Sequence, residues 1–326
     1  MLAVQSFKSA DSFQIEFHQR CGYLNDPHVR ALAWLLLAPD LLDRHAPQWH
    51  GKIATLPIQM LEGLDVWLQN LDHQPDALHA YLDMQPFARL GRYAEKLMAF
   101  FLEHQGVLFA HGVQVRAGKN STIGEFDFLL HIDEQLIHWE FATKFYLLES
   151  CGAGDDADYF VGPNLADTLG AKMHKILDRQ LLLSTHPAAQ IHLPAPVSCA
   201  QALVKGWLFY PEYELPQPSV FGTSVTHCRG FWCTFSDTMN LRADRYMILP
   251  RLQWLAPAKS AVKQTMDRQA LQSYLAEYFV EDTMPVLVAL LEIDGDVAVE
   301  ASRGFIVPDD WRTRAGQRVK LVHPST

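Results

Sequence analysis

The chain has 326 residues, of which 49% are hydrophobic and 20% charged, and its formal net charge is −10. This is the composition of an ordinary globular protein with room for a large core. The negative net charge opposes non-specific binding to nucleic acid, which depends on phosphate neutralisation by Lys and Arg. Any nucleic-acid enzyme would therefore have to concentrate its basic residues locally.

Several classes of protein do not fit this sequence. The five cysteines are odd in number and scattered, so they do not form a disulfide framework. No secretory signal is evident at the N-terminus, and the longest apolar stretch, 31–38, is too short to cross a membrane. We expect a cytoplasmic protein with no membrane partner.

Three regions are expected along the chain: a helical region over 1–87, a core over 88–210 and an α+β region over 211–326. In the first region, Asn25, Asp26 and Pro27 form a cap-and-first-turn signal before an apolar helix at 29–37. Apolar residues at helical spacing predict a further helix over 58–71. In the third region a helix is expected over 262–279.

The core region shows the order helix, three strands, helix, strand. An apolar stripe predicts a helix over 89–105, with Glu95 near the edge of its buried face. Strands follow over 106–116 and, as a pair with a short turn, over 124–146. A helix capped by Asn164 is expected over 165–184, and an apolar strand over 202–210. A parallel strand after a helix favours a right-handed crossover and therefore a mixed α/β sheet.

Charged side chains interrupt the two paired strands of the core. Glu125 and Asp127 are two residues apart and so share one face of their strand, as do Glu140 and Lys144, which are four apart. An unpaired buried charge costs several kcal/mol, so these groups must pair, reach water or hold a metal. Hard cations such as Mg²⁺ prefer carboxylate ligands. The competing interpretation is an ion-pair network at a sheet edge.

The element order and its charged residues resemble the restriction-endonuclease-like superfamily, the PD-(D/E)XK phosphodiesterases. More closely, the segments GEFDFLL, KFYL and GPN resemble a bacterial family known only as a domain of unknown function and grouped with that superfamily. The resemblance implies an α/β fold with a restriction-endonuclease-like mixed-sheet core (αβββαβ), flanked by an N-terminal helical extension and a C-terminal α+β extension.

The same resemblance implies roles for four residues. Asp127 and Glu140 would be ligands of Mg²⁺ or Mn²⁺, Glu95 an outer ligand or a water orienter, and Lys144 the charge stabiliser. One departure from the superfamily pattern concerns the lysine, because Ala142 occupies its usual position. On a flat strand the Cα atoms of Glu140 and Lys144 would be roughly 13 Å apart at ~3.3 Å per residue.

The function expected from these features is that of a Mg²⁺-dependent phosphodiesterase, a nuclease acting on nucleic acid. Candidate substrate-binding residues are basic ones in the core: Lys119, Lys172, Lys175 and Arg179. The alternative is a non-catalytic nucleic-acid-binding or scaffold protein that retains the nuclease fold. A hydrolase of a small phosphate ester is a third interpretation, without a dedicated motif.

Other residues that could bind metals have structural explanations. His227, Cys228 and Cys233 offer three zinc ligands, but no matching further pair is visible, and buried cysteines in a strand pair are favoured. The acidic loop around 155–158 lacks the spacing of a calcium loop and is expected to be solvated. His138, near the turn between the paired strands, is expected at the surface.

Overall fold

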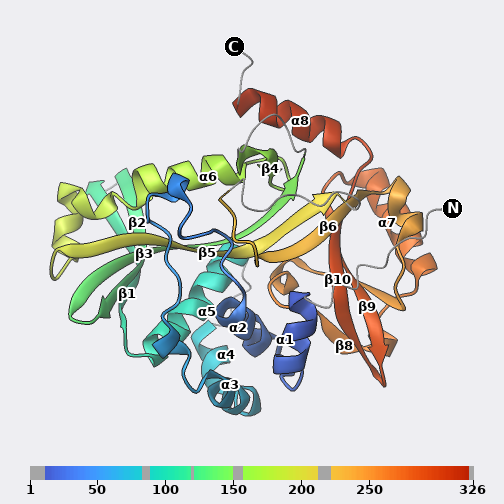
Figure 1. The fold of residues 1–326 in the computed structure, drawn as a ribbon, viewed down its shortest axis with the longest axis horizontal. Helices are drawn as coiled ribbons and strands as arrows, with labels where there is room; N and C mark the ends of the chain where they lie inside the picture. The colour runs from blue at the N-terminus through green and yellow to red at the C-terminus, as the bar shows by residue number, and fades with distance from the viewer. Residues whose placement is uncertain (1–11, 83–88, 119–120, 150–156, 212–221, 323–326) are drawn as a thin grey trace.

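A computed structural model of the protein describes residues 12–82, 89–118, 121–149, 157–211 and 222–322 (Figure 1). The helices are α1 (Phe13–Cys21), α2 (Pro27–Leu37), α3 (Leu64–His73), α4 (Asp76–Leu82), α5 (Leu90–His104), α6 (Leu169–Lys175), α7 (Arg268–Glu281) and α8 (Trp311–Val322). The strands are β1 (Leu108–Gly118), β2 (Ser121–Ile132), β3 (Gln135–Leu148), β4 (Phe160–Val161), β5 (Val197–Pro211), β6 (Cys228–Thr234), β7 (Arg245–Ile248), β8 (Lys259–Ala261), β9 (Val286–Asp294) and β10 (Val297–Val307).

The described strands form one ten-stranded mixed sheet, in the order β1-β2-β3-β5-β6-β10-β9-β7, with β4 on β3 and β8 on β10. The first three strands are antiparallel neighbours, whereas β5 runs parallel to both β3 and β6. The mixed α/β sheet with flanking helices is therefore confirmed, and α5, β1, β2, β3, α6 and β5 follow in the predicted order. Strands of the C-terminal region extend the same sheet, and the region boundaries at 87 and 210 stay predictions.

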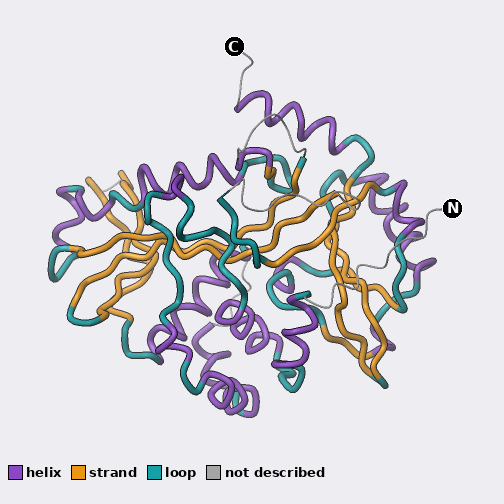
Figure 2. Tube along the Cα trace, viewed as in Figure 1, coloured by secondary structure: helices purple, strands orange, loops and turns teal. Residues whose placement is uncertain are grey.

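Helices cover both faces of this sheet (Figure 2). On β3, Trp139, Phe145 and Leu147 belong to the core that contains α2 and α5. Ala142 and Tyr146, of the opposite parity, pack with α6 in a second core cluster. The strand alternation predicted from the sequence is thus present in β3, and it directs Glu140 and Lys144 toward the α6 side.

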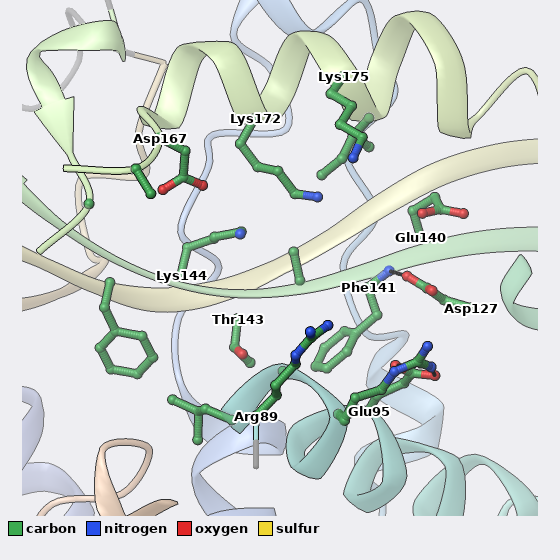
Figure 3. Close-up of a pocket in the computed structure, with 18 of the residues that line it drawn as sticks. Arg89, Glu95, Asp127, Glu140, Phe141, Thr143, Lys144, Asp167, Lys172 and Lys175 are labelled. Carbon is green, nitrogen blue, oxygen red and sulfur yellow. Dashed lines mark hydrogen bonds and ion pairs between the residues drawn. The ribbon is translucent and has the colours of Figure 1, made fainter. Parts of the chain in front are cut away.

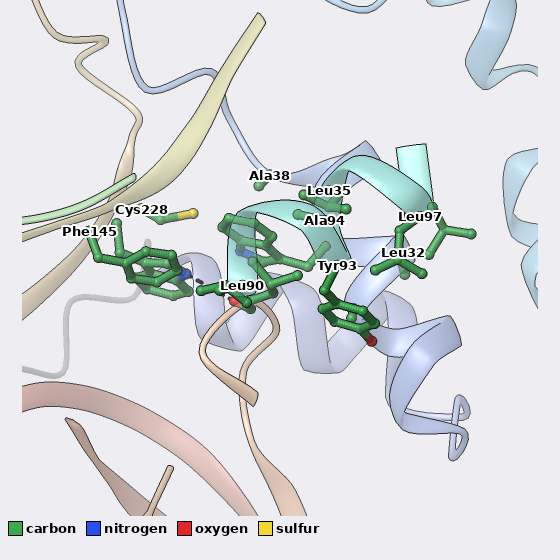
Figure 4. Packing of buried hydrophobic residues seen from close by; sticks show 14 of the residues in the cluster. Leu32, Leu35, Ala38, Leu90, Tyr93, Ala94, Leu97, Phe145 and Cys228 are labelled. Carbon is green, nitrogen blue, oxygen red and sulfur yellow. Dashed lines mark hydrogen bonds between the residues drawn. The ribbon is translucent and has the colours of Figure 1, made fainter. Parts of the chain in front are cut away.

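Helix α5 packs on the sheet through the apolar stripe that the sequence predicts. Leu90, Tyr93, Ala94 and Leu97 are buried, and they face residues of α2 such as Leu35 (Figure 4). This orientation leaves the neighbouring Glu95 beside the sheet rather than in solvent, since its side chain is only 14% exposed. The expected placement of α5 is confirmed.

Three predicted helices differ from those observed. The helix expected over 165–184 begins only at Leu169, because Leu165 adopts a left-handed φ of 61° and Thr168 caps the helix in place of Asn164. It continues as a π-helix over Ile176–Gln180. The helix expected over 58–71 is interrupted at Gly63, whose φ is 69°, and the helix expected over 262–279 begins at Arg268.

The buried acid Asp158 explains the late start of α6. Its carboxylate accepts hydrogen bonds from the Thr168 hydroxyl and, at 2.8 Å, from the Ala171 amide. Asp158 is only 4% exposed, so the solvated position expected for this part of the acidic loop is wrong for Asp158. Residues 150–156 lie outside the described ranges.

A glycine allows β5 to lie close to β3 beside the site. Gly206 is the partner of Lys144 in the parallel ladder, and a Cβ added at Gly206 would overlap the Lys144 carbonyl oxygen. Because that neighbour is backbone, it cannot move aside without distorting the ladder. We expect Gly206→Ala to lower the free energy of unfolding by about 1–3 kcal/mol, as overpacking does. Urea denaturation would measure this. Gly118→Ala, where a Cβ meets no atom within 4 Å, is the matched control, and equal stabilities would contradict the prediction.

Candidate functional site

The paired strands β2 and β3 separate at the point where the charged residues begin. Their ladder runs from the Ile132–Gln135 pair only as far as Phe128 and Trp139. Beyond it, the Phe141 amide donates to Asp127 Oδ2 at 2.9 Å, so a side chain replaces the strand partner. The alternation of β2 also breaks here, because Phe128 packs in the core under α5 while Phe126 packs with Leu129 in a different cluster. We call this separation of β2 and β3, next to Asp127 and Phe141, the fork. It lets residues from both faces of the sheet line the same cavity.

Three carboxylates meet at the fork. Glu95 of α5 and Glu125 and Asp127 of β2 each offer an oxygen, and these oxygens lie within 4.8 Å of one another. Arg92 is their cationic neighbour: its guanidinium donates to Glu125 at 2.6 Å and to Glu95 at 3.2 Å. Such a set of oxygen donors suits a hard divalent cation. The sequence places Glu125 among the charged residues that could hold a metal, although the superfamily resemblance assigns it no role.

Glu140 lies next to this cluster but is held by other partners. Glu140 and Asp127 influence each other's pKa, as expected for residues on neighbouring strands. Glu140 Oε1 is 2.9 Å from His138 Nε2, and its Oε2 accepts from the Gln180 amide at 2.5 Å. The residue is only 1% exposed. The superfamily resemblance implies Asp127 and Glu140 as the ligands, whereas the structure brings Asp127 together with Glu95 and Glu125, and Glu140 is engaged by His138 and Gln180.

Glu95, Asp127 and Glu140 hold protons more tightly than free carboxylates do, whereas the hydrogen bond from Arg92 lowers the pKa of Glu125. Burial, followed by the charge of Asp127, raises the pKa of Glu95 to about 7. Burial and the neighbouring Glu140 raise the pKa of Asp127 to about 7, and burial raises that of Glu140 to about 7 although Lys172 opposes it. A site with this much uncompensated negative charge would be stabilised by a bound cation.

Two lysines of the cavity occupy different positions relative to these acids. Glu140 and Asp127 both act on the pKa of Lys172, and Lys172 is the cation with the largest effect on Glu140. The neighbours that influence Lys144 are instead Lys172, Asp167 and Lys175. Helix α6 therefore brings Lys172, rather than Lys144, to the carboxylates (Figure 3).

A cavity of about 1080 Å³ contains the fork and extends along β3. It is lined by α5, by β3, by the segment before α6 and by part of the C-terminal region, including Trp254. Its lining holds seven basic residues against five acidic ones, in a chain of net charge −10. The basic residues are Arg89, Arg92, Lys144, Lys172, Lys175, Arg179 and Arg251, and the acidic ones are Glu95, Glu125, Asp127, Glu140 and Asp167. Local concentration of basic charge is what the sequence required of a nucleic-acid enzyme.

The candidate substrate-binding residues divide into two groups. Lys172, Lys175 and Arg179 line the cavity. Lys119 lies outside the described residues.

The sequence did not predict the two hydrogen-bond partners of Glu140, His138 and Gln180. His138 is fully buried, so its expected surface position is wrong. It precedes Glu140 by two residues and therefore shares its strand face, which was the available signal. Gln180 follows the apolar Ile176 and Leu177 by four and three residues, so it shares their face of the expected helix, where a polar group needs a partner. Burial lowers the pKa of His138 to about 4, so the ring is neutral beside Glu140.

The zinc alternative finds no support in the described structure. His227 Nε2 lies 2.7 Å from the Tyr210 hydroxyl, and its Nδ1 contacts the Ser224 carbonyl oxygen. Cys228 is buried in β6 with a pKa raised to about 12, mainly by burial. Among the described residues, the acidic group at the fork is the cluster that could hold a metal.

The raised pKa values predict how pH changes metal binding. In the folded, metal-free protein Glu95, Asp127 and Glu140 hold protons that the unfolded chain releases above about pH 4.5. Their contribution to stability is therefore full at low pH and is lost as pH rises through about 7. Mn²⁺ needs the deprotonated forms, so we expect the rise in melting temperature caused by Mn²⁺ to be larger at about pH 8 than at about pH 6. Thermal melts with and without Mn²⁺ measure it, and an equal rise at both pH values would count against a carboxylate site.

Comparison with known proteins identifies one family. A family model described as a domain of unknown function (DUF1853) matches residues 30–307 of the chain. No curated protein and no solved structure matches it. The family description names no superfamily, so the link to the PD-(D/E)XK phosphodiesterases stays a prediction. None of the described helices combines the length and the apolar character needed to span a bilayer.

Proposed function

Because the chain belongs to the DUF1853 family, whose description states no function, we propose a function from its site: that of a divalent-metal-dependent phosphodiesterase acting on nucleic acid. The observation that carries this proposal is the meeting of three carboxylates, Glu95, Glu125 and Asp127, with Lys172 facing their neighbour Glu140 across one cavity. The residues come from α5, β2, β3 and α6, so the fold assembles them from distant parts of the chain.

The donor set fits Mg²⁺ or Mn²⁺ as the cofactor. All the candidate ligands are carboxylate oxygens, they converge within 4.8 Å, and burial raises the pKa of two of them to about 7. Glu95, Glu125 and Asp127 would hold the ion. When bound, such an ion polarises a phosphodiester and supplies a nucleophile from bound water. Arg92, which bridges the two glutamates here, would have to shift toward the cavity rim, where its side chain is already 53% exposed.

Side chains behind the carboxylates would keep them in position. The Phe141 amide fixes one oxygen of Asp127, while His138 and Gln180 hold both oxygens of Glu140. Groups that orient ligands in this way tune metal affinity by about 10- to 100-fold. We therefore assign Glu140 a positioning role beside Asp127, instead of the ligand role that the superfamily pattern implies.

Lys172 would stabilise the charge that develops on the phosphate. Its ammonium lies on the α6 side of the fork, 3.4 Å from Gln180 Oε1, and it is electrostatically coupled to Glu140 and Asp127. The superfamily pattern places this lysine on the strand, where this chain has Ala142. The proposal is that a helix supplies the function from the opposite wall of the cavity.

The fold is compatible with the restriction-endonuclease-like superfamily. The order of α5, β1, β2, β3, α6 and β5, with an antiparallel three-stranded start and a parallel β5, is the order that the superfamily resemblance implies. This supports the proposal through its arrangement alone, because no solved structure matches the chain.

One observation favours the alternative, a non-catalytic nucleic-acid-binding or scaffold protein. Arg92 already pairs with Glu95 and Glu125, and both oxygens of Glu140 are engaged. A protein that had lost its metal would keep its charges balanced in this manner. The two functions differ in whether the site turns over substrate.

Cleavage assays distinguish them. Labelled single-stranded, duplex and branched DNA, and RNA, would be incubated with the wild-type protein and Mg²⁺ or Mn²⁺, with EDTA as the metal-free condition. The proposed function predicts metal-dependent cleavage of at least one substrate. Binding of nucleic acid without cleavage of any substrate, under conditions where Mn²⁺ occupies the protein, would favour the scaffold.

A further inference from the structure

The cavity is divided into an acidic and a basic half. Glu95, Asp127 and Glu140 lie together around the fork. Lys172 and Lys175 reach into the cavity from α6, and Lys144 lies on the far side of Lys172 from Glu140 (Figure 3). The acidic half accounts for one metal and one reacting phosphate. The proposed function uses Lys172 from the basic half, and it leaves Lys144 and Lys175 without a role.

Lys144 lacks a counter-ion in direct contact among the described residues. It projects from β3 into the cavity, and its ammonium lies 5.9 Å from the centre of the Tyr146 ring. Within the part of the chain that the structure describes, it has neither a hydrogen bond nor an ion pair. Burial and the neighbouring Lys172 lower the pKa of Lys144 to about 8, which reflects a cation held near other cations.

The acid that influences Lys144 does not form an ion pair with it. Asp167, in the segment before α6, favours the charged forms of both Lys144 and Lys172. Its carboxylate, however, accepts a hydrogen bond from the Tyr146 hydroxyl at 3.0 Å, and the structure shows no ion pair between Asp167 and either of these described lysines. Lys144 and Lys175 thus have no ion-pair partner among the described residues, and Arg89 at the start of α5 adds a further cation to the same cavity.

Like charges that converge on a cavity are stabilised by an anion placed between them. We propose that Lys144 and Lys175 form a subsite for a second phosphate of the substrate, next to the reacting phosphate at the fork. The substrate class is then a nucleic-acid strand with successive phosphates, and not a lone phosphodiester or a small phosphate ester. This inference rests on the proposed function for the position of the reacting phosphate, but the subsite itself requires only binding.

The subsite changes the role expected for Lys144. A residue that contacts a phosphate away from the reacting bond holds the substrate equally in the ground state and the transition state, so its loss raises KM and leaves kcat in place. A hydrogen bond between a charged donor and a phosphate supports an effect of about 10- to 100-fold on affinity. Each phosphate contact with a single strand also contributes about 0.7 to the slope of log K against log salt concentration.

Binding measurements in EDTA test the subsite without relying on catalysis. Fluorescence anisotropy would follow labelled dT₆ and rU₆ and, as a probe with one phosphate, the dinucleotide TpT, each over a range of salt concentrations. The variants are Lys144→Gln, Lys175→Gln and the control Lys263→Gln, which alters an exposed lysine outside the cavity. Lys175 is exposed at the cavity rim, so its variant gives the result if Lys144→Gln melts at a lower temperature.

We expect Lys144→Gln to weaken binding of at least one hexanucleotide by about 10- to 100-fold and to reduce its salt slope by about 0.7, with a smaller effect on TpT and none for Lys263→Gln. Wild-type affinity and slope for both hexanucleotides in Lys144→Gln and Lys175→Gln would overturn the subsite. If the wild type binds as expected but cleaves nothing with Mg²⁺ or Mn²⁺, the proposed function fails and the subsite stands. If the wild type cleaves a substrate and both Lys144→Gln and Lys175→Gln keep its KM, the proposed function stands and the subsite fails.

Discussion

Asp127→Asn is expected to abolish metal-dependent cleavage and to weaken Mn²⁺ binding by more than about 100-fold. Even residues behind metal ligands change affinity by about 10- to 100-fold, and Asp127 is the acid that joins Glu95, Glu125 and Glu140 at the fork. Isothermal titration of Mn²⁺ and the cleavage assay measure the two effects on the same protein.

The same substitution should leave the fold intact. Asparagine keeps an oxygen that accepts the Phe141 amide, and it removes a buried charge whose pKa is raised to about 7 by burial and by Glu140. At pH 8 without metal, the variant is therefore expected to melt at or above the temperature of the wild type. Glu16→Gln, on the exposed face of α1, is the control for loss of a carboxylate. Asp127→Asn that binds Mn²⁺ like the wild type would remove Asp127 from the site.

Lys172→Met is the second substitution with a large expected effect. Methionine retains most of the length of the side chain but not its charge, so the packing of α6 is preserved while the cation that acts on Glu140 is lost. We expect kcat to fall by about 10²–10³-fold, as when one stabilising donor is removed from a transition state. Mn²⁺ affinity should change little, because lysine is not a ligand.

Lys144→Gln is the comparison for Lys172→Met, because it shows which of the two lysines affects kcat. The sequence assigns the stabilising role to Lys144, whereas the structure couples Lys172 to the carboxylates. Steady-state kinetics should therefore separate the variants, with kcat reduced in Lys172→Met and KM raised in Lys144→Gln. A loss of kcat in Lys144→Gln with normal turnover in Lys172→Met would restore the strand lysine to the catalytic position.

Much of the central fold follows from local sequence patterns. The apolar stripe of 89–105 and the alternation of β3 are properties of single elements, and both are present in the structure. The Asn25, Asp26 and Pro27 signal is likewise correct, since the Asp26 side chain accepts from the amides of His28 and Val29 at the start of α2. Each of these features depends on residues a few positions apart.

The composition of the site depends on contacts that the sequence pattern does not contain. Strand alternation alone predicts a common face for Glu125 and Asp127, but the fork after Phe128 turns them toward α5 and Glu95. The start of α6 is set by Asp158, a residue outside the helix, and that start determines where Lys172 lies. Both effects are tertiary contacts. The superfamily pattern, which rests on single strands, therefore implies a stabilising role for Lys144 and a ligand role for Glu140 that we now propose for other residues.

The central claim is that Glu95, Glu125 and Asp127 hold one divalent cation, and anomalous scattering from crystals soaked in Mn²⁺ tests it most directly. We predict a single strong anomalous peak between the three carboxylates, about 2.0–2.2 Å from their oxygens, with the Arg92 guanidinium displaced from its present contacts. Crystals of Asp127→Asn under the same conditions should lack the peak. A wild-type fork that stays free of Mn²⁺ at millimolar concentration, with the Arg92 contacts unchanged, would contradict the account.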